Sequence, residues 1–397
     1  MLDKAISIKS LTECEVCGGG SLETVMDLPL FPLTGIFVSD KEPGSSHGHD
    51  QKLQFCETCG HAQLESVLAP AFLYGEHYAH RSSASHLTPP AVEFFLNCLD
   101  KLRPGNRFKL SVEIGCNEMV LLDRVLARSD RVVGIDPLWQ RMTPDEKPGR
   151  QVLGKFLEDV DLEVELGGRP DLVISTHNLE HINDPAGQLS RLMDVAVDDA
   201  LFLMEVPDFD LMVDNLRFDQ VFHQHVHYFG MASFLRIIEK LGGHYLTHFY
   251  NYRSWGGTVV VAFTKSANGA TPPAPKPRKL SIVKERYSLF QERMDGTTRL
   301  LEGVTGEMWA YGAAQMLPTL AYHMKTDFGF LEGVLDDCPQ RTGLTYPEID
   351  VRINKPDDAT KLDDAVVLIT ALDAVRPIMN RLRDFNPRFV VIPSHVY

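Results

Sequence analysis

The stretches VEIGCNEMVLL (112–122), RVVGIDP (131–137) and DLVISTHNLEHINDP (171–185) decide the fold of this chain. Each is rich near its start in apolar, mostly β-branched residues and passes directly into a polar turn or a helical segment. Apolar strands that alternate with helical stretches are typical of a doubly wound parallel sheet. Because ligands in such folds bind at the carboxyl ends of the strands, we expect the polar residues that end these stretches to share one site.

The first two stretches carry residues suited to holding a nucleoside. Glu113 and Gly115 stand at a strand-to-helix turn, where a glycine lets the backbone approach a ligand closely. The usual form of this loop is Glu/Asp-x-Gly-x-Gly-x-Gly, and here Asn117 and Met119 occupy the later glycine places. Asp136 ends the second strand, a position from which a carboxylate accepts hydrogen bonds from both ribose hydroxyls.

The order of these features is similar to that of the S-adenosylmethionine-dependent methyltransferases. A dinucleotide site is the rival interpretation, but it requires Gly-x-Gly-x-x-Gly, which Gly-Cys-Asn-Glu-Met at 115–119 does not supply. We therefore predict a class I methyltransferase domain built on a doubly wound sheet. The residues predicted to bind S-adenosylmethionine are Glu113, Gly115, Asn117, Asp136, His177 and Asn178.

Two Cys-x-x-Cys pairs precede this region. Their spacing lets each pair of thiolates take two corners of a tetrahedron, and together the pairs make a closed site. We therefore predict a structural Zn²⁺ ion held by Cys14, Cys17, Cys56 and Cys59. A redox role is the alternative, which the lack of a thioredoxin-like βαβ context disfavours. Histidines near the pairs that offer substitute ligands are His47, His49 and His61.

The length, charge and hydrophobicity of the chain limit the kinds of molecule that it can bind. The 397-residue chain is 44% hydrophobic and has a formal net charge of −15, so it is long enough for two or three domains and would repel nucleic acid. It contains neither a signal-peptide-like start nor an apolar run long enough to span a bilayer. We expect a cytoplasmic protein, a monomer or dimer, with no nucleic-acid or membrane partner.

Changes in composition along the chain predict four parts. Residues 1–70 form the zinc-binding domain, and 71–264 form the methyltransferase domain. Residues 265–280 are dense in Pro, Ala and Lys and form a linker. Residues 281–397 begin with a long helix and then cycle again between strands and helices, which predicts a C-terminal Rossmann-like α/β domain that binds substrate.

This arrangement resembles the sugar-nucleotide C-methyltransferases, three-domain enzymes that methylate C3 of a dTDP-4-keto sugar in deoxysugar pathways. The resemblance covers almost the whole chain. It is carried by the paired cysteines and by the segments YAHRSSAS (78–85), HNLEHINDP (177–185), FHQHVHYF (222–229) and WAYGAA (309–314). It implies a nucleotide-linked keto-deoxysugar as the small-molecule substrate.

The resemblance also implies a mechanism, in which a base removes a proton next to a ketone and the enolate attacks the sulfonium methyl group. The family segment Tyr-His-Glu-His matches Phe222-His223-Gln224-His225, so His225 is the implied base. Imidazole suits this task because its unperturbed pKa lies near the working pH. The implied catalytic residues are His225, His181, His223 and Tyr78, with Tyr74 as an alternative to Tyr78.

The chain departs from the family at three points. Phe222 and Gln224 remove a hydroxyl and a carboxylate, and GAAQMLPT (312–319) lacks the family's Lys-Gly after Gly-Ala. Two further hypotheses therefore stand beside C-methylation. One is O-methylation of a sugar or natural-product hydroxyl, and the other is a non-catalytic binding protein on the same fold. Histidines 223, 225 and 227 alternate as they would on one face of a strand, and a metal site at these histidines is also open.

Overall fold

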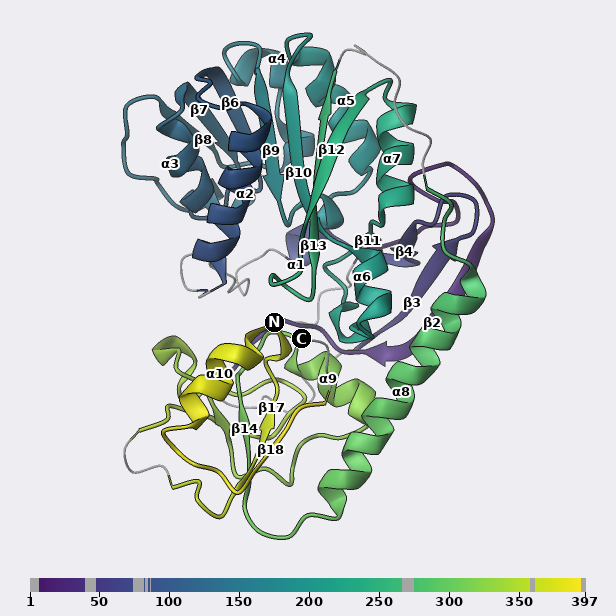
Figure 1. Cartoon of the computed structure of the whole chain (residues 1–397), viewed down its shortest axis with the longest axis vertical. Coiled ribbons are helices and arrows are strands. Elements are labelled where there is room, and N and C mark those ends of the chain that lie inside the picture. Colours follow the sequence, from purple (N-terminus) through teal and green to yellow (C-terminus); the bar gives the residue numbers. More distant parts are fainter. Residues whose placement is uncertain are drawn as a thin grey trace.

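The computed structural model describes residues 7–39, 48–73, 82, 85, 87–265, 275–357 and 361–393. The chain folds around three main sheets, each assembled largely from one region of the sequence. Figure 1 shows the central sheet at the top, the N-terminal sheet at the side and the C-terminal sheet at the bottom, with the long helix α8 (Leu280–Glu302) running along one side of the molecule.

The N-terminal sheet has four antiparallel strands in the order β11-β4-β3-β2. Their bounds are β2 (Leu22–Phe31), β3 (His49–Cys56), β4 (Ala62–Leu64) and β11 (His227–Tyr228). A separate antiparallel pair is formed by β1 (Ile8–Ser10) and β5 (Ser66–Leu68), and the short helix α1 (Pro70–Leu73) follows. Strand β11 comes from far along the chain, so this sheet is completed by the central region.

The central sheet has seven strands in the order β12-β13-β10-β9-β6-β7-β8, and β13 alone runs opposite to the other six. The strands are β6 (Phe108–Ile114), β7 (Ser129–Ile135), β8 (Arg150–Leu153), β9 (Leu172–Thr176), β10 (Leu201–Pro207), β12 (His244–Asn251) and β13 (Thr258–Thr264). This strand order, with one reversed strand next to the edge, is that of the class I methyltransferase fold.

The central sheet is buried on both faces. Val112 and Ile114 of β6 pack in one hydrophobic cluster, whereas Leu172 and Ile174 of β9 pack in another. Because successive residues of a strand point to opposite faces, continuous apolar runs are what such a sheet requires. One face is covered by α2 (Thr88–Leu102) and α3 (Val120–Leu126), and the other by α4 (Leu162–Glu165), α5 (Pro185–Val195) and α7 (Met231–Lys240). Helix α6 (Phe209–Asp214) packs instead with residues of the N- and C-terminal regions.

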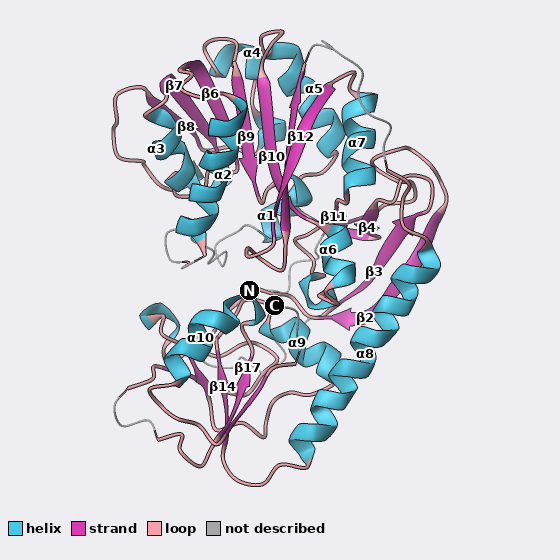
Figure 2. Cartoon of the chain, in the orientation of Figure 1, coloured by secondary structure: helices cyan, strands magenta, loops and turns pink. Residues whose placement is uncertain are grey.

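The C-terminal sheet has five parallel strands in the order β16-β15-β14-β17-β18. They are β14 (Met308–Tyr311), β15 (Val334–Leu335), β16 (Ile353–Asn354), β17 (Val366–Ile369) and β18 (Phe389–Val391). Helices α9 (Leu317–Met324) and α10 (Val375–Leu382) belong to this unit, and Figure 2 shows it on the opposite side of the molecule from the central sheet.

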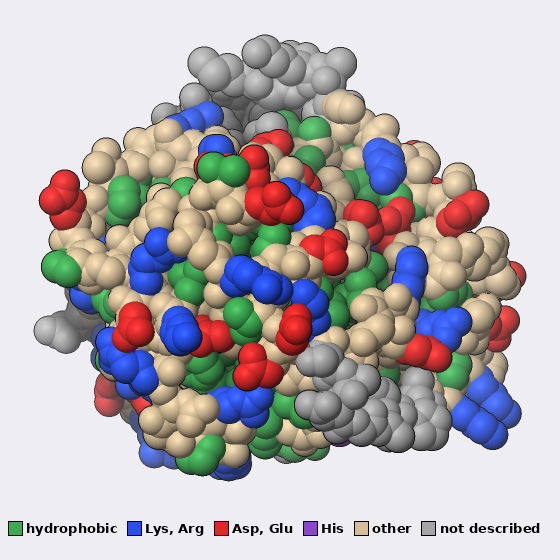
Figure 3. Space-filling model, turned by 90° about the horizontal axis from the view of Figure 1, so that it is seen from above, with side chains coloured by type: hydrophobic (Ala, Val, Ile, Leu, Met, Phe, Trp, Pro, Cys, Tyr) green, Lys and Arg blue, Asp and Glu red, His purple; other side chains and the backbone are tan. Residues whose placement is uncertain are grey.

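The charge on the surface is relevant to nucleic-acid binding, and the length and polarity of the helices are relevant to membrane insertion. On the face shown in Figure 3, acidic and basic side chains are interspersed rather than gathered into one patch. No helix within the described ranges is both long and apolar enough to cross a membrane.

Most expected elements are present, with differences at short strands. The long helix predicted near 281–302 is α8, and the strands predicted around 112–122, 131–137 and 171–185 are β6, β7 and β9. The histidine segment is different from the expected strand, because only His227 lies in a strand while 223–225 form a turn. The predicted linker lies mostly outside the described residues.

Candidate functional site

One cavity of about 1710 Å³ faces both the central and the C-terminal sheets. It lies at the carboxyl ends of the parallel strands, where each polypeptide turn exposes backbone groups and polar side chains to a ligand. Its wall includes predicted site residues from the central sheet, namely Glu113, Gly115, Asn117, Asp136, His177, Asn178, His181 and His225. Residues from the ends of β14, β15 and β17 complete it on the other side.

The loop after β6 is fixed by Asp136 and Asn117. One carboxylate oxygen of Asp136 accepts a hydrogen bond from the Asn117 N–H at 2.8 Å, and the other accepts one from Leu138 N–H at 2.8 Å. The side-chain oxygen of Asn117 accepts a bond from Ser82 N–H, and its carbonyl oxygen accepts one from the Trp139 indole. These contacts hold the loop in an ordered path although two of the usual glycines are replaced.

Gly115 is required by its surroundings. Its φ of +72° lies in the left-handed region, and a Cβ at this position would come within 2.4 Å of the Asn178 side chain. Two predicted cofactor residues therefore pack directly against each other at the carboxyl ends of β6 and β9. Glu113 lies beside them, 2% exposed, and one of its carboxylate oxygens has no hydrogen-bond partner within the described chain. Burial and the charge of Asp136 raise the pKa of Glu113.

The donor set fits S-adenosylmethionine. A buried carboxylate with an unused oxygen, a glycine that keeps the backbone open and an acid at the end of β7 all border the same cavity. The carboxylate of Asp136 accepts hydrogen bonds from two backbone N–H groups of the loops that border the cavity. An acid at this strand end is the usual partner of ribose hydroxyls in doubly wound folds.

The histidines of the 222–228 segment point to different sides of the chain. His225 lines the cavity, and its ring lies 4.6 Å from that of His181 and 4.0 Å from that of Phe222. His223 does not line it: its ring nitrogens lie 3.0 Å from the Phe31 carbonyl oxygen and 3.3 Å from the Gln51 amide nitrogen. The turn at 223–225 separates these side chains. This placement gives His223 a role in joining the N-terminal sheet to the central region.

The cavity histidines differ in charge preference. Burial and the neighbouring His181 and His177 hold the pKa of His225 well below its ordinary value, so His225 is neutral near pH 7. Burial also lowers the pKa of His181, whose Nδ1 lies 2.8 Å from the Gln224 carbonyl oxygen. For His177, burial opposes the charged form, but the carboxylate of Glu180 and the charges of Glu205 and Asp373 outweigh it and raise the pKa.

Gln224 is engaged with the N-terminal region. Its side-chain amide nitrogen donates to the Thr34 carbonyl oxygen at 3.1 Å, and its side-chain oxygen accepts from the Thr34 hydroxyl at 3.0 Å. This pair fixes the backbone whose carbonyl orients His181. Tyr78 and Tyr74, by contrast, lie outside the described residues.

The C-terminal wall repeats the geometry of the loop after β6. Gly312 directly follows β14 and has a φ of +102°, and a Cβ there would come within 2.4 Å of Ala371, which follows β17. Asp336 follows β15, and its two carboxylate oxygens accept hydrogen bonds from the N–H groups of Ala313 at 2.7 Å and Cys338 at 2.8 Å. A glycine after the first strand and an acid after the second thus face the cavity from both sheets.

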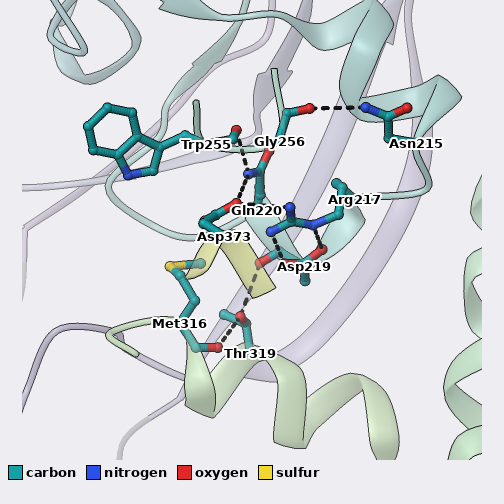
Figure 4. Close-up of polar contacts among 9 residues, drawn as sticks. All are labelled: Asn215, Arg217, Asp219, Gln220, Trp255, Gly256, Met316, Thr319 and Asp373. Carbon is teal, nitrogen blue, oxygen red and sulfur yellow. Dashed lines mark hydrogen bonds and ion pairs between the residues drawn. The ribbon is translucent and has the colours of Figure 1, made fainter. Parts of the chain in front are cut away.

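A polar network joins the two sides of the cavity (Figure 4). Arg217 donates two hydrogen bonds to Asp219 at 2.9 Å each and a third to Asp373 of the C-terminal unit at 2.9 Å. Gln220 donates to the Trp255 carbonyl oxygen at 2.8 Å, and the Trp255 ring lies 4.3 Å from that of His177. The network therefore connects the loop that carries Trp255 with the C-terminal wall.

The four predicted zinc ligands converge. Their sulfur atoms all lie within 4.8 Å of one another, with Cys14 to Cys59 and Cys17 to Cys56 both at 3.6 Å. A tetrahedral zinc ion with Zn–S bonds of about 2.3 Å places its sulfur ligands roughly 3.8 Å apart, so the site fits structural Zn²⁺. Each Cys-x-x-Cys pair turns back through a left-handed glycine whose N–H donates to the carbonyl of the pair's first cysteine; these glycines are Gly18 and Gly60.

Several residues of the site escaped the sequence analysis. Glu180 adjoins the cavity histidines, Glu205 and Trp255 line the wall, and Arg217 with Asp373 bridges its two sides. The position of Glu180 beside His181 in HNLEH was a usable signal. For the others no motif exists, because their roles depend on segments brought together only by folding.

Comparisons with known proteins agree with this architecture. Residues 14–74 match a family described as "Putative zinc binding domain", and residues 86–247 match a family described as "Methyltransferase domain". The curated protein C-methyltransferase NovU of Streptomyces niveus is 26% identical over 240 residues, which are 59% of this chain and 56% of NovU. The chain thus matches little more than half the length of this relative.

Solved methyltransferases also align with part of the chain. The N-methyltransferase NodS from Bradyrhizobium japonicum WM9 shares 10% identity, covering 47% of this chain and 99% of NodS, with a TM-score of 0.36. The 1,6-didemethyltoxoflavin-N1-methyltransferase of Burkholderia thailandensis shares 15% identity, covering 47% of this chain and 80% of its own, with a TM-score of 0.35. The strand order and the family matches, rather than these alignments, decide the assignment. The chain therefore combines a zinc-binding domain with a class I S-adenosylmethionine-dependent methyltransferase domain, and it is related in sequence to the C-methyltransferase NovU.

Proposed function

We propose that this protein transfers a methyl group from S-adenosylmethionine to a carbon next to the ketone of a nucleotide-linked keto-deoxysugar. The observation that carries the proposal is the repeated pairing of a glycine and an acid at the carboxyl ends of two sheets that border one cavity. Such a pair is suited to a nucleoside, so the cavity has places for two nucleoside ligands. His181 and His225 line the same cavity.

In this proposal the two nucleosides belong to the methyl donor and to the sugar carrier. Glu113, Gly115, Asn117, Asp136, His177 and Asn178 hold S-adenosylmethionine, which supplies an electrophilic methyl group when bound. Gly312 and Asp336 hold the nucleoside of the substrate. The relation to a C-methyltransferase supports transfer to carbon.

His225 is the proposed base. Because burial and neighbouring histidines keep it neutral, its imidazole has a lone pair ready to accept a proton near pH 7. The C–H bond next to the ketone breaks, the proton goes to His225, and the electron pair forms the enolate. Bound S-adenosylmethionine would supply the methyl group to the enolate carbon and leave as S-adenosylhomocysteine, which keeps the electron pair of the broken S–CH₃ bond. His181, oriented by the Gln224 carbonyl, is proposed to contact the substrate. Tyr78 stays a proposed catalytic residue on the basis of the sequence.

The proposal extends to the organisation of the whole protein. We propose the four-part division at residues 70, 264 and 280, with a cytoplasmic location that keeps the four cysteines reduced for zinc. The chain is proposed to act as a monomer or dimer on a small molecule, without a nucleic-acid partner.

Titration with S-adenosylhomocysteine, alone and with a panel of nucleotides and nucleotide sugars, tests the two-ligand cavity. We expect micromolar cofactor binding and binding of at least one nucleotide. Methyl-transfer assays of the wild type and of His225→Ala then test the base, and NMR of the product separates a new C–CH₃ from an O–CH₃ group. A wild type that binds no cofactor and methylates no sugar nucleotide would refute the enzyme and favour a binding protein.

A further inference from the structure

A buried carboxylate lies between two of the cavity histidines. Glu180 belongs to the short 3₁₀ turn Leu179–His181 that follows β9, and it is 1% exposed. Its Oε1 atom is 3.6 Å from Nδ1 of His177 and 3.9 Å from Nε2 of His225. Within the described part of the chain, neither carboxylate oxygen of Glu180 accepts a hydrogen bond.

Burial of the Glu180 carboxylate without a hydrogen bond is energetically unfavourable for the fold. A carboxylate removed from water without a hydrogen-bond partner destabilises the fold, and a nearby positive charge is the usual compensation. The ion-pair partners of Glu180 in the described structure are the imidazoles of His177 and His225. The carboxylate is therefore best stabilised when one of these rings carries a proton.

We propose that Glu180 is the positioning residue of the deprotonation step, a counter-ion that orients His225 and stabilises the imidazolium formed when His225 takes the substrate proton. This inference rests on the function proposed above. Nε2 of His225 carries its hydrogen toward Oε1 of Glu180, which leaves the lone pair on Nδ1 to accept the proton. No bond to Glu180 forms or breaks, so its contribution is electrostatic and geometric.

The surrounding charges are consistent with this role. The titratable groups that interact with Glu180 come from three segments: the turn region after β9, strand β10 and the 222–228 segment. They are His177, His181, Glu205, His225 and Tyr228. Glu180 also lies beside His177. Burial lowers the pKa of His177, but Glu180 and two further carboxylates outweigh this effect and raise it. Because burial keeps His225 neutral at rest, the charge that appears on this ring during catalysis needs a nearby anion.

Glu180 supplies the carboxylate that Gln224 does not. The Gln224 side chain is bonded to Thr34 and does not supply an anion to the cavity. The carboxylate of Glu180 approaches His225 from the turn after β9. The backbone of Gln224 still contributes, through its carbonyl oxygen at 2.8 Å from Nδ1 of His181.

A divalent metal is the competing occupant of this cluster, since one ligand atom each from Glu180, His181 and His225 lie within 4.8 Å of one another. Ligands bound at about 2.1 Å to a tetrahedral ion lie roughly 3.4 Å apart. The distance of 3.9 Å from Glu180 to His225 is longer. The geometry favours a long-range ion pair over a metal centre.

The test is a comparison of Glu180→Gln and Glu180→Asp with the wild type. We expect Glu180→Gln to lower kcat by at least about 10²-fold while the KM for the sugar nucleotide and the affinity for S-adenosylhomocysteine stay unchanged. The acid limb of the pH–kcat profile should move down by about one unit or more, because His225 loses the anion that favours its protonation. Glu180→Asp, which keeps the charge, should recover part of kcat.

Stability distinguishes this role from a structural one. At alkaline pH, where His177 and His225 are both neutral, removal of a buried carboxylate without hydrogen bonds should leave the Tm of Glu180→Gln equal to or above that of the wild type. Glu239→Gln is the matched control, because Glu239 pairs with Arg236 on the exposed face of α7 and should leave every parameter unchanged. A fall in Tm with an unaltered pH profile in both Glu180 variants would overturn the inference.

The outcomes also separate this inference from the proposed function. If His225→Ala is inactive but Glu180→Gln matches the wild type, Glu180 has no such role and the proposed base stands. If His225→Ala is fully active, the base itself is wrong and the inference falls with it. Elemental analysis should find one zinc per chain in the wild type and in Glu180→Gln, and a second metal equivalent lost in the variant would overturn the counter-ion role.

Discussion

We expect the stability of this protein to depend on Arg217, which bridges the two sides of the cavity. The side chain of Arg217 is 9% exposed, and those of its partners Asp219 and Asp373 are 5% and 24% exposed. Asp219 accepts two of the hydrogen bonds of the guanidinium and Asp373 accepts one. Burial opposes the charge of Arg217, but the two carboxylates outweigh it and raise its pKa. Arg217 therefore stays charged when either Asp219 or Asp373 is replaced.

We expect Asp219→Asn to cost about 3–5 kcal/mol of unfolding free energy, because it leaves a buried guanidinium with one anion instead of two. Asp373→Asn should cost about 1–2 kcal/mol, since it loses one charge-assisted bond at a more exposed position and retains an oxygen that accepts a neutral one. Asp384→Asn is the control, because its ion pair with Arg381 is exposed and should contribute under about 1 kcal/mol.

The measurement is urea denaturation followed by tryptophan fluorescence, together with limited proteolysis to detect separate loss of the C-terminal unit. Because several domains are present, the transitions should be fitted individually and not as one two-state step. We expect Asp373→Asn to expose the C-terminal unit to cleavage at lower urea than the wild type. If both network variants unfold like Asp384→Asn, the bridge does not stabilise the arrangement of the two sides, and the reasoning from burial is refuted.

Three further predictions concern the cofactor loop, the zinc site and pH. Gly115→Ala should abolish S-adenosylhomocysteine binding in calorimetry while the zinc content stays unchanged, because its Cβ would meet Asn178 at 2.4 Å and a left-handed backbone adds about 1–2 kcal/mol; unaltered binding would contradict the assigned loop. Cys56→Ser should release zinc, as measured by elemental analysis, and lower the Tm, and a wild-type Tm would show that the metal is not structural. Burial lowers the pKa of His323 to about 3, so between about pH 6.5 and 3 the unfolded chain binds a proton that the folded chain does not. The stability that depends on neutral His323 is thus fully present above pH 6.5, and about 1.4 kcal/mol of it is lost for each pH unit as the pH falls. His323→Gln should therefore flatten the acid limb of a pH–Tm curve. An unchanged acid limb would mean that the ring is charged in the folded state.

The sequence predicted the fold well because the relevant signals are local. Continuous apolar runs such as 172–174 and 201–204 indicate strands buried on both faces, and the paired cysteines indicate a metal by their spacing alone. The short strands β8 and β16 were missed because a few residues carry too weak a periodic signal. The alternation of histidines at 223, 225 and 227 suggested one strand face, but pairing with the N-terminal sheet begins only at His227.

By itself, the sequence determined that the chain has a class I methyltransferase domain and a four-cysteine zinc site, since apolar periodicity and ligand spacing are properties of consecutive residues. Only the tertiary structure decided which polar groups meet. It directed His223 toward Phe31 and His225 into the cavity, and it brought Glu180 between two imidazoles. It also brought Arg217 to Asp373, 156 residues away along the chain. These contacts depend on how the sheets pack, and packing is a cooperative property of the whole chain that no local pattern encodes.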